Sequence, residues 1–187
     1  LLLFFLGLFF SFSSTSSLAG ERLNKDYYFF FSKHFSFAIL ALLIMFLISI
    51  IETSLLKKLV IPLFMISFIL LALVPIMGLE VKGSKRWLDL YFFKLQPIEI
   101  LKPFFILTTV KILTLEKLQN YQIKYFFSFL LLCSVIILLV DQPDLGQSIL
   151  LTGSWIFTVF ISGVSIFYIF GFFSIFLVSL TSLLFLL

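Results

Sequence analysis

The chain has 187 residues, of which 62% are hydrophobic and only 12% are charged. This composition excludes an ordinary soluble domain, which is closer to half apolar and needs polar residues to cover its core. The formal net charge of +4 makes anionic lipid or an anionic substrate a natural partner, and the lack of a basic soluble module argues against nucleic acid.

Apolar segments follow one another along the whole chain, each long enough or nearly long enough to cross a membrane. A spanning helix needs about 20 mostly apolar residues. The sequence therefore predicts an all-α fold, a polytopic transmembrane helix bundle that forms one domain over 1–187. The expected spans are 1–18, 35–51, 59–77, 97–115, 125–140, 147–161 and 166–187. Polar stretches at 20–33, 52–58, 78–96, 116–124, 141–146 and 162–165 separate them.

The first segment, 1–18, has two interpretations. Small residues at 17–20 suit cleavage of a signal peptide, but no basic stretch precedes the apolar run. We favour a truncated first helix, because apolar segments continue through the rest of the chain. The chain opens at Leu1 and closes at Leu187 inside apolar runs, so we expect a fragment truncated at both ends.

The basic residues are divided unequally between the two ends of the predicted helices. With seven spans, 8 Lys and Arg residues fall on the side of 20–34, 78–96 and 141–146, and 5 fall on the other side. The positive-inside rule would make the first side cytoplasmic. That rule concerns membrane insertion, however, and it fails where basic residues are retained to bind an anion.

The single cysteine and the single histidine predict no special chemistry. Cys133 lies in an apolar run and has no partner for an intramolecular disulfide, so we expect a packing residue. His34 lies at the edge of an apolar run, and a lone histidine makes no metal site.

A charged pair opens the fourth predicted span. Glu99 and Lys102 are three residues apart and share a helix face. A charge in the membrane costs about 2.5–3.5 kcal/mol on insertion scales, so both side chains should face protein or water and pair. Pro97 suits a first helical turn, and Pro103 can kink the helix and open room for a ligand. The pair is either a structural ion pair or part of a functional site.

Two further polar motifs stand out. In the longest polar stretch, Lys82, Lys85 and Arg86 lie beside Trp87, which suits either anchoring in the headgroup zone or phosphate binding by the guanidinium. Asp144 lies just before the sixth predicted span, where its carboxylate can accept the free N–H groups of the helix start.

Together, the three motifs resemble the SEDS family of bacterial membrane proteins. They read Lys82–Gly83–Ser84–Lys85–Arg86–Trp87, then Gln96–Pro97–Ile98–Glu99 with Lys102, then Gln142–Pro143–Asp144–Leu145–Gly146. Their order, spacing and helix phase agree with those of the family, and the resemblance covers essentially the whole chain as the first seven of ten helices. Ile98 is a departure, because the family often has Ser there. Residues 80–83, 102–103 and 146–147 look closer to the division-type branch than to the elongation type.

The resemblance implies a peptidoglycan glycosyltransferase of cell division. Such proteins are multi-pass proteins of the bacterial cytoplasmic membrane that polymerise lipid II at its external face. Their partners are a class B penicillin-binding protein and other divisome membrane proteins. The implied topology places 78–96 outside, against the charge count. In the implied reaction, a base takes the proton of the attacking sugar hydroxyl, and a cation or a divalent metal ion stabilises the leaving pyrophosphate.

The resemblance also implies where the site residues lie. The catalytic Asp of the family lies in an external loop beyond Leu187, so we expect no catalytic residue in this chain, which on its own should be inactive. The implied substrate-binding residues are Glu99, Lys102, Lys82, Arg86, Lys94, Gln96 and Asp144.

Two other functions remain open from these residues alone. The buried Glu99–Lys102 pair also suits a transporter that flips a lipid-linked cell-wall precursor. The helices also suit a non-catalytic membrane scaffold that recruits a penicillin-binding protein.

Overall fold

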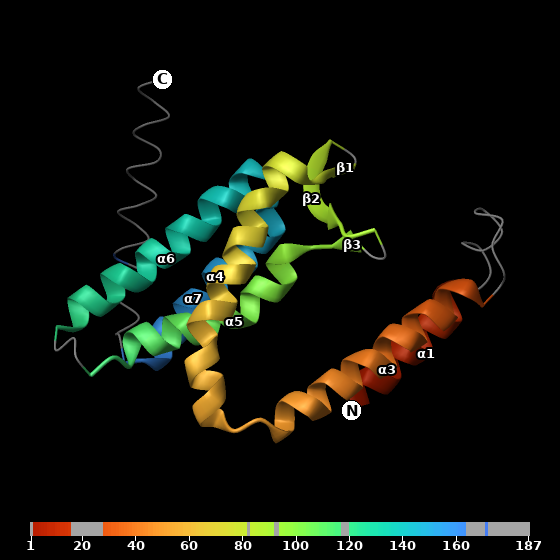
Figure 1. Cartoon of the computed structure of the whole chain (residues 1–187), viewed down its shortest axis with the longest axis horizontal. Coiled ribbons are helices and arrows are strands. Elements are labelled where there is room, and N and C mark those ends of the chain that lie inside the picture. The colour runs from red at the N-terminus through yellow and green to blue at the C-terminus, as the bar shows by residue number, and fades with distance from the viewer. Residues whose placement is uncertain are drawn as a thin grey trace. The chain divides into compact units, whose positions relative to one another are not determined.

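The computed structural model describes residues 2–15, 28–81, 83–91, 94–116, 120–163 and 171 (Figure 1). The chain divides into two compact units, Leu1–Leu56 and Lys57–Leu187, and each is described by itself. Apart from residue 171, the predicted seventh span at 166–187 lies outside the described residues, as does most of the predicted loop at 20–33.

The first unit packs two apolar helices against each other, α1 (Leu2–Thr15) and α3 (Phe29–Ile50). The ring of Phe12 meets that of Phe31 edge-on, with centroids 5.2 Å apart, and stacks on Tyr28 at 6.2 Å. Aromatic pairs at these separations stabilise packing. Because backbone groups near the membrane must bond within a helix, α3 begins well before residue 35, the start predicted from hydropathy.

The helix α4 (Thr53–Met77) begins inside the polar turn predicted at 52–58. Lys57 and Lys58 are therefore helical, and the predicted turn is wrong beyond its first residue. The physical reason is that a helix satisfies its own backbone groups, while a long lysine side chain at a helix end reaches the headgroup zone. Pro62 and Pro75 lie inside α4 near its two ends.

Three helices that contact one another form the core of the second unit: α5 (Pro97–Leu113), α6 (Tyr121–Asp141) and α7 (Leu145–Ile161). The centre of this core consists of fully buried apolar side chains, to which α4 contributes Leu71. They are Leu71, Leu101, Phe105, Val135, Leu139 and Leu151. Because lipid tails are as apolar as leucine, close packing rather than exclusion of water holds such a core together in a membrane.

The start of α6 also differs from the prediction. The helix begins at Tyr121, inside the polar stretch predicted at 116–124. Asn120 is its N-cap, and the side-chain oxygen of Asn120 accepts the backbone N–H of Gln122 at 2.9 Å. A capping asparagine satisfies one of the free N–H groups of a helix start, which explains the earlier beginning.

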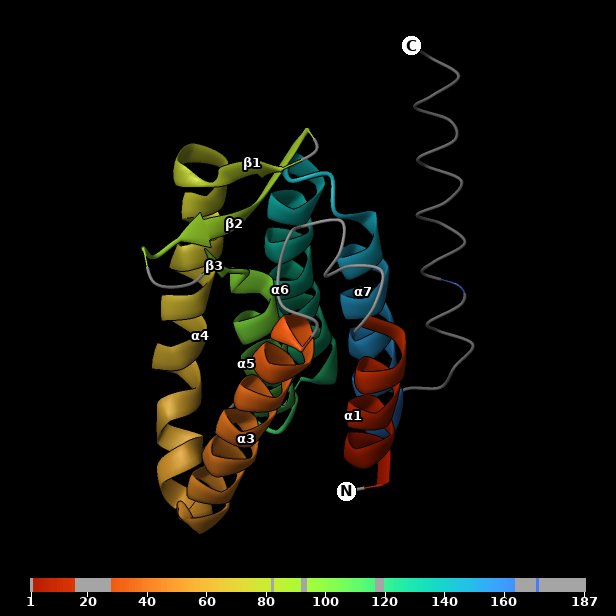
Figure 2. The same cartoon turned by 90° about the vertical axis from the view of Figure 1, so that its right-hand side faces the viewer.

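A small antiparallel sheet occupies the predicted loop at 78–96. Its strands are β1 (Leu79–Val81), β2 (Ser84–Asp89) and β3 (Lys94–Leu95), in the order β1-β2-β3. The tight turn between Val81 and Ser84 contains Gly83 with φ +79°, a left-handed conformation that glycine adopts without steric penalty. Figure 2 shows the sheet at the end of α4, where the chain leaves the helix. The sequence did not predict these strands.

Within the described residues, three helices are long and apolar enough to cross a membrane: Phe31–Ile50, Thr53–Met77 and Tyr121–Asp141. The helix α7 is a shorter apolar helix of the same character. The all-α membrane bundle predicted from the sequence is therefore confirmed, with a small sheet added at one end of the second unit.

Candidate functional site

The first turn of α5 carries the charged pair that the sequence predicted. Pro97 occupies the first turn, and Gln96 is the N-cap, whose carbonyl accepts the backbone N–H of Glu99 at 3.1 Å. The ammonium of Lys102 lies 2.7 Å from Oε2 of Glu99. The Glu99 side chain is 50% exposed, whereas that of Lys102 is only 19% exposed. The pair is thus half open and presents a carboxylate at the surface.

The side chain of Ile98, where the sequence departs from the family, lies in the apolar core and not beside the charged pair. It is 1% exposed and belongs to the apolar core with Leu101 and Leu139. An isoleucine there fills core volume, so the departure does not touch the charged pair.

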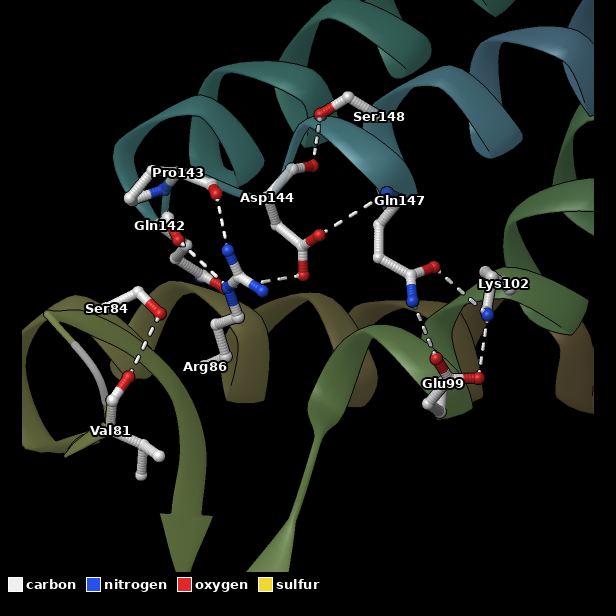
Figure 3. A network of polar contacts seen from close by, with 10 residues as sticks. All are labelled: Val81, Ser84, Arg86, Glu99, Lys102, Gln142, Pro143, Asp144, Gln147 and Ser148. Carbon is white, nitrogen blue, oxygen red and sulfur yellow. Dashed lines mark hydrogen bonds and ion pairs between the residues drawn. The ribbon is translucent and has the colours of Figure 1, made fainter.

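Gln147 joins α7 to this pair. Its side-chain nitrogen donates to Oε1 of Glu99 at 2.9 Å, and its side-chain oxygen accepts from Lys102 at 3.1 Å (Figure 3). One neutral amide therefore contacts both charges. The sequence did not single out Gln147 as a site residue, although its place three positions after the capping Asp144 was a signal that could have drawn attention to it.

Asp144 is the N-cap of α7, as the sequence predicted. Its carboxylate accepts the backbone N–H of Gln147 at 3.4 Å, and its carbonyl accepts the hydroxyl of Ser148 at 3.0 Å. Asp144 is only 7% exposed, and its carboxylate lies 3.6 Å from Nε of Arg86. A carboxylate this buried needs such partners. Asp144 therefore links β2 to the start of α7.

Arg86 projects from β2 onto the turn between α6 and α7 (Figure 3). Its Nη2 donates to the carbonyl of Pro143 at 2.6 Å, and its Nε donates to that of Gln142 at 3.4 Å. Lys85 donates to the carbonyl of Pro75 at the end of α4, at 3.3 Å. The two basic residues thus fasten the sheet to the helix ends, a role that neither of the two predicted interpretations included.

Gln142 connects the same turn to α4 through a buried hydrogen bond. It is 3% exposed, and its side-chain nitrogen donates to the carbonyl of Leu71 at 3.2 Å. In a regular helix that carbonyl accepts the N–H of the residue four positions on, which here is Pro75 and has no N–H. Gln142 thus satisfies a buried carbonyl that the proline leaves free.

Two further predicted site residues, Lys94 and Gln96, contribute no side chain to these contacts. Lys94 is exposed on β3 and pairs with Asp89 in the strand register. The side chain of Gln96 makes no capping hydrogen bond within the described residues. Lys82 lies outside the described residues. The structure therefore brings together residues from all three motifs, namely Arg86, Glu99, Lys102, Gln142 and Asp144.

The described residues contain no group of three or more His, Cys, Asp and Glu side chains that could hold a metal ion. What the contacts form is a continuous polar network, from Arg86 through Asp144 and Gln147 to Glu99 and Lys102. Its exposed end is the Glu99 carboxylate. Such an arrangement suits the binding of a polar or charged group at the edge of a membrane, beside a fixed ammonium.

Comparison with known proteins links the chain to cell-cycle proteins. The family model for FtsW, RodA and SpoVE, described as "Cell cycle protein", matches residues 1–187. The chain is 30% identical over 156 residues to the probable peptidoglycan glycosyltransferase FtsW of Wigglesworthia glossinidia brevipalpis, which covers 82% of this chain and 41% of that relative.

Two solved structures share the fold. A chain of a peptidoglycan synthase complex that coordinates polymerization and crosslinking matches with a TM-score of 0.78 and 27% identity, over 96% of this chain and 52% of that one. The rod shape determining protein RodA of Thermus thermophilus matches with a TM-score of 0.69 and 28% identity, over 92% of this chain and 58% of that one. The chain thus spans between 41% and 58% of the length of these proteins.

Proposed function

Because the chain belongs to the FtsW/RodA/SpoVE family of cell cycle proteins, the SEDS family, we propose that the full-length protein is a peptidoglycan glycosyltransferase of cell division. It polymerises lipid II at the external face of the bacterial cytoplasmic membrane, together with a class B penicillin-binding protein and other divisome proteins. The family description, "Cell cycle protein", supports the division role, and the relative named as a probable peptidoglycan glycosyltransferase supports the activity. The similarity to a chain of a peptidoglycan synthase complex supports a partnered polymerase.

One observation carries the link from fold to chemistry. The Glu99–Lys102 pair lies at the start of α5, half exposed, beside the polar loop that the family topology places outside. An ammonium held in place at the membrane edge suits the pyrophosphate of lipid II, because charge-assisted hydrogen bonds to phosphate oxygens are strong. We therefore assign Glu99 and Lys102 to the wall of the substrate cavity.

The other predicted residues have different parts in this proposal. Lys94 and Lys82 attract the anionic headgroup near the mouth of the cavity, and Gln96 borders the same helix start. Arg86 and Asp144 act chiefly by holding the sheet and the α6–α7 turn around the cavity, as their contacts support.

The reaction transfers a growing sugar chain. A sugar hydroxyl attacks the anomeric carbon that bears the pyrophosphate, a new glycosidic bond forms, and the bond to the pyrophosphate oxygen breaks. A base takes the hydroxyl proton, and cationic groups stabilise the charge that develops on the leaving group. We assign the second task to Lys102, whose ammonium Glu99 holds through an ion pair at 2.7 Å.

The decisive experiment uses the purified full-length protein with its penicillin-binding partner, in detergent, with lipid II as substrate. Glycan chains should form without any membrane, and Glu99→Ala should abolish them while leaving partner binding intact. Gel analysis of chain length and co-purification of the partner measure the two properties. Full activity in Glu99→Ala would defeat the cavity role. Failure of the wild-type protein to form glycan would favour transport of the precursor or a scaffold role.

A further inference from the structure

The side chain of Gln147, in the first turn of α7, makes contacts that are unusual for a glutamine at the start of a helix. Gln147 is the third residue of α7, and Asp144 is the N-cap. In a capping box, a Gln at this place reaches back to the backbone N–H of the N-cap residue. Here that N–H of Asp144 instead donates to the carbonyl of Leu139 at 3.0 Å. The side chain of Gln147 is therefore not needed by its own helix.

Both ends of the amide are used on α5. The nitrogen faces the carboxylate of Glu99 and the oxygen faces the ammonium of Lys102, at 2.9 Å and 3.1 Å. A carboxylate only accepts hydrogen bonds and an ammonium only donates them, so the two charges dictate this orientation. A neutral side chain with one donor and one acceptor end, long enough to reach both, is what the pair requires.

The contacts determine how the carboxylate is presented. Oε1 of Glu99 is held by Gln147, and Oε2 is held by Lys102 at 2.7 Å. With each oxygen held by a different donor, the carboxylate cannot rotate freely about its last torsion. The Glu99 side chain remains 50% exposed, so the remaining lone pairs meet whatever enters the site. Groups held in one orientation before the substrate arrives lower the barrier of the reaction.

We propose that Gln147 is a positioning residue, whose amide fixes the Glu99 carboxylate and the Lys102 ammonium in a single geometry toward the substrate. This inference rests on the proposed function, because it assumes that the pair lines the substrate site. It adds a residue inside α7 to a site whose predicted members lie on α5, in the 78–96 loop and at the N-cap of α7. The backbone N–H of Gln147 donates to the carboxylate of Asp144, which also pairs with Arg86 on β2. Gln147 therefore connects the Glu99–Lys102 pair to the sheet.

Two variants of Gln147 test the proposal in the full-length protein with its partner. Gln147→Leu keeps the approximate size and removes both hydrogen bonds, whereas Gln147→Asn is too short to reach both charges. Each should lower kcat for lipid II polymerisation by about tenfold to a hundredfold, with a smaller change in KM. The matched controls are Gln122→Leu and Gln122→Asn, because Gln122 is an exposed glutamine in the first turn of α6, outside the network.

A double variant separates positioning from mere loss of fold. Lys102→Arg keeps the charge but alters the geometry of the pair, so Gln147→Leu should lower kcat less in this background than alone, because residues that act as one unit are not additive. A defect that only reduces the folded fraction would multiply with the effect of Lys102→Arg instead. If Gln147→Leu does not fold, as judged by thermal unfolding, Gln147→Asn is measured in the same two backgrounds.

The outcomes are distinct. If the wild-type protein polymerises lipid II and the Gln147 variants match the Gln122 controls, or if their losses multiply with that of Lys102→Arg, the positioning role is overturned. If the wild-type protein forms no glycan, the proposed function itself fails. A loss of kcat confined to the Gln147 variants, and reduced beside Lys102→Arg, supports the role.

Discussion

At the scale of single residues, the polar side chains of this protein hold the backbone together as much as they prepare a site. Arg86 shows this most clearly, because its guanidinium contacts two carbonyls of the α6–α7 turn and the carboxylate of Asp144. Arginine suits the task, since its several N–H donors lie in one rigid plane. Arg86, for which the sequence left headgroup anchoring and phosphate binding open, thus links β2 to the α6–α7 turn and to the N-cap of α7 in the fold.

Replacing Arg86 should lower the free energy of unfolding. In Arg86→Ala, the buried Asp144 loses its ion pair and the carbonyl of Pro143 loses its donor. A buried group that loses its partner costs about 1–3 kcal/mol, which applies to Asp144 but not to the exposed Pro143. The Arg86 side chain is itself 36% exposed, so solvent screens part of the effect. We expect a loss of about 1 kcal/mol, measured as a lower midpoint of thermal unfolding in detergent. Lys94→Ala, on the exposed strand β3, is the control and should leave the midpoint unchanged. Equal midpoints for both variants would contradict the fastening role.

At the scale of secondary-structure elements, a glutamine in the α6–α7 turn supplies the hydrogen-bond donor that a proline removes from α4. Pro75 leaves the carbonyl of Leu71 without its helical donor, and Gln142 supplies one from 71 residues further along the chain. Membrane helices tolerate prolines only where such neighbours satisfy the freed backbone groups. The α6–α7 turn is therefore hydrogen-bonded to α4 at the carbonyl that Pro75 leaves without a helical donor.

A double-mutant cycle measures the coupling energy between Gln142 and Pro75. Gln142→Leu should destabilise the protein by about 1–3 kcal/mol, because the buried carbonyl of Leu71 then has no donor. Pro75→Ala restores a helical N–H for that carbonyl, so Gln142→Leu should cost much less in the Pro75→Ala background. Chemical or thermal unfolding of the four proteins gives the coupling energy. Additive effects would show that the two residues act independently.

The sheet depends on one glycine in its first turn. Gly83 has φ +79°, and a Cβ built there meets no atom within 4 Å, so only backbone strain opposes a side chain. Gly83→Ala should therefore destabilise by about 1–2 kcal/mol, the penalty for an L-residue in this conformation. Gly83→Asn should be milder, because asparagine tolerates the left-handed region. A lower unfolding midpoint for Ala than for Asn is the expected result, and the reverse order would exclude a strained turn.

At the scale of the whole molecule, the described part of the second unit has two unlike ends. One end carries the sheet and the polar network of acidic and basic groups. At the other end, the ammonium of Lys111, on α5, donates to the carbonyl of Lys57, on α4, at 2.8 Å. Lys124, in the first turn of α6, lies over the ring of Tyr121 at 5.4 Å. Basic residues thus lie at both ends and are more numerous on the side of the sheet, so the orientation that we expect rests on the family resemblance and not on charge.

Cysteine labelling tests this orientation. In a Cys133→Ala background, Ser84→Cys in the sheet should react with an impermeant thiol reagent added to the outside of intact cells. Thr114→Cys, at the opposite end of α5, should react only after the membrane is opened. Thr114 is exposed and Ser84 is partly exposed, so a cysteine at either position can react on its own side. Labelling of Ser84→Cys only after permeabilisation would invert the topology.

The sequence by itself determined the local features of this protein. The apolar runs predicted the helices, the spacing of Glu99 and Lys102 predicted their ion pair, and the place of Asp144 predicted a helix cap. The order of the three motifs identified the family. Apart from the order of the motifs, these features depend on residues close to one another in the chain, where helix geometry alone sets the distances.

Only the tertiary structure decided what the polar residues do to one another. Gln147 meets Lys102 and Glu99 across 45 and 48 residues of chain, and Arg86 meets the α6–α7 turn across 56 and 57. Such contacts depend on how helices pack and on which backbone groups a proline or a short strand leaves free. A sequence pattern that repeats along one helix carries no record of these partners, because they come from different elements that only the fold brings together.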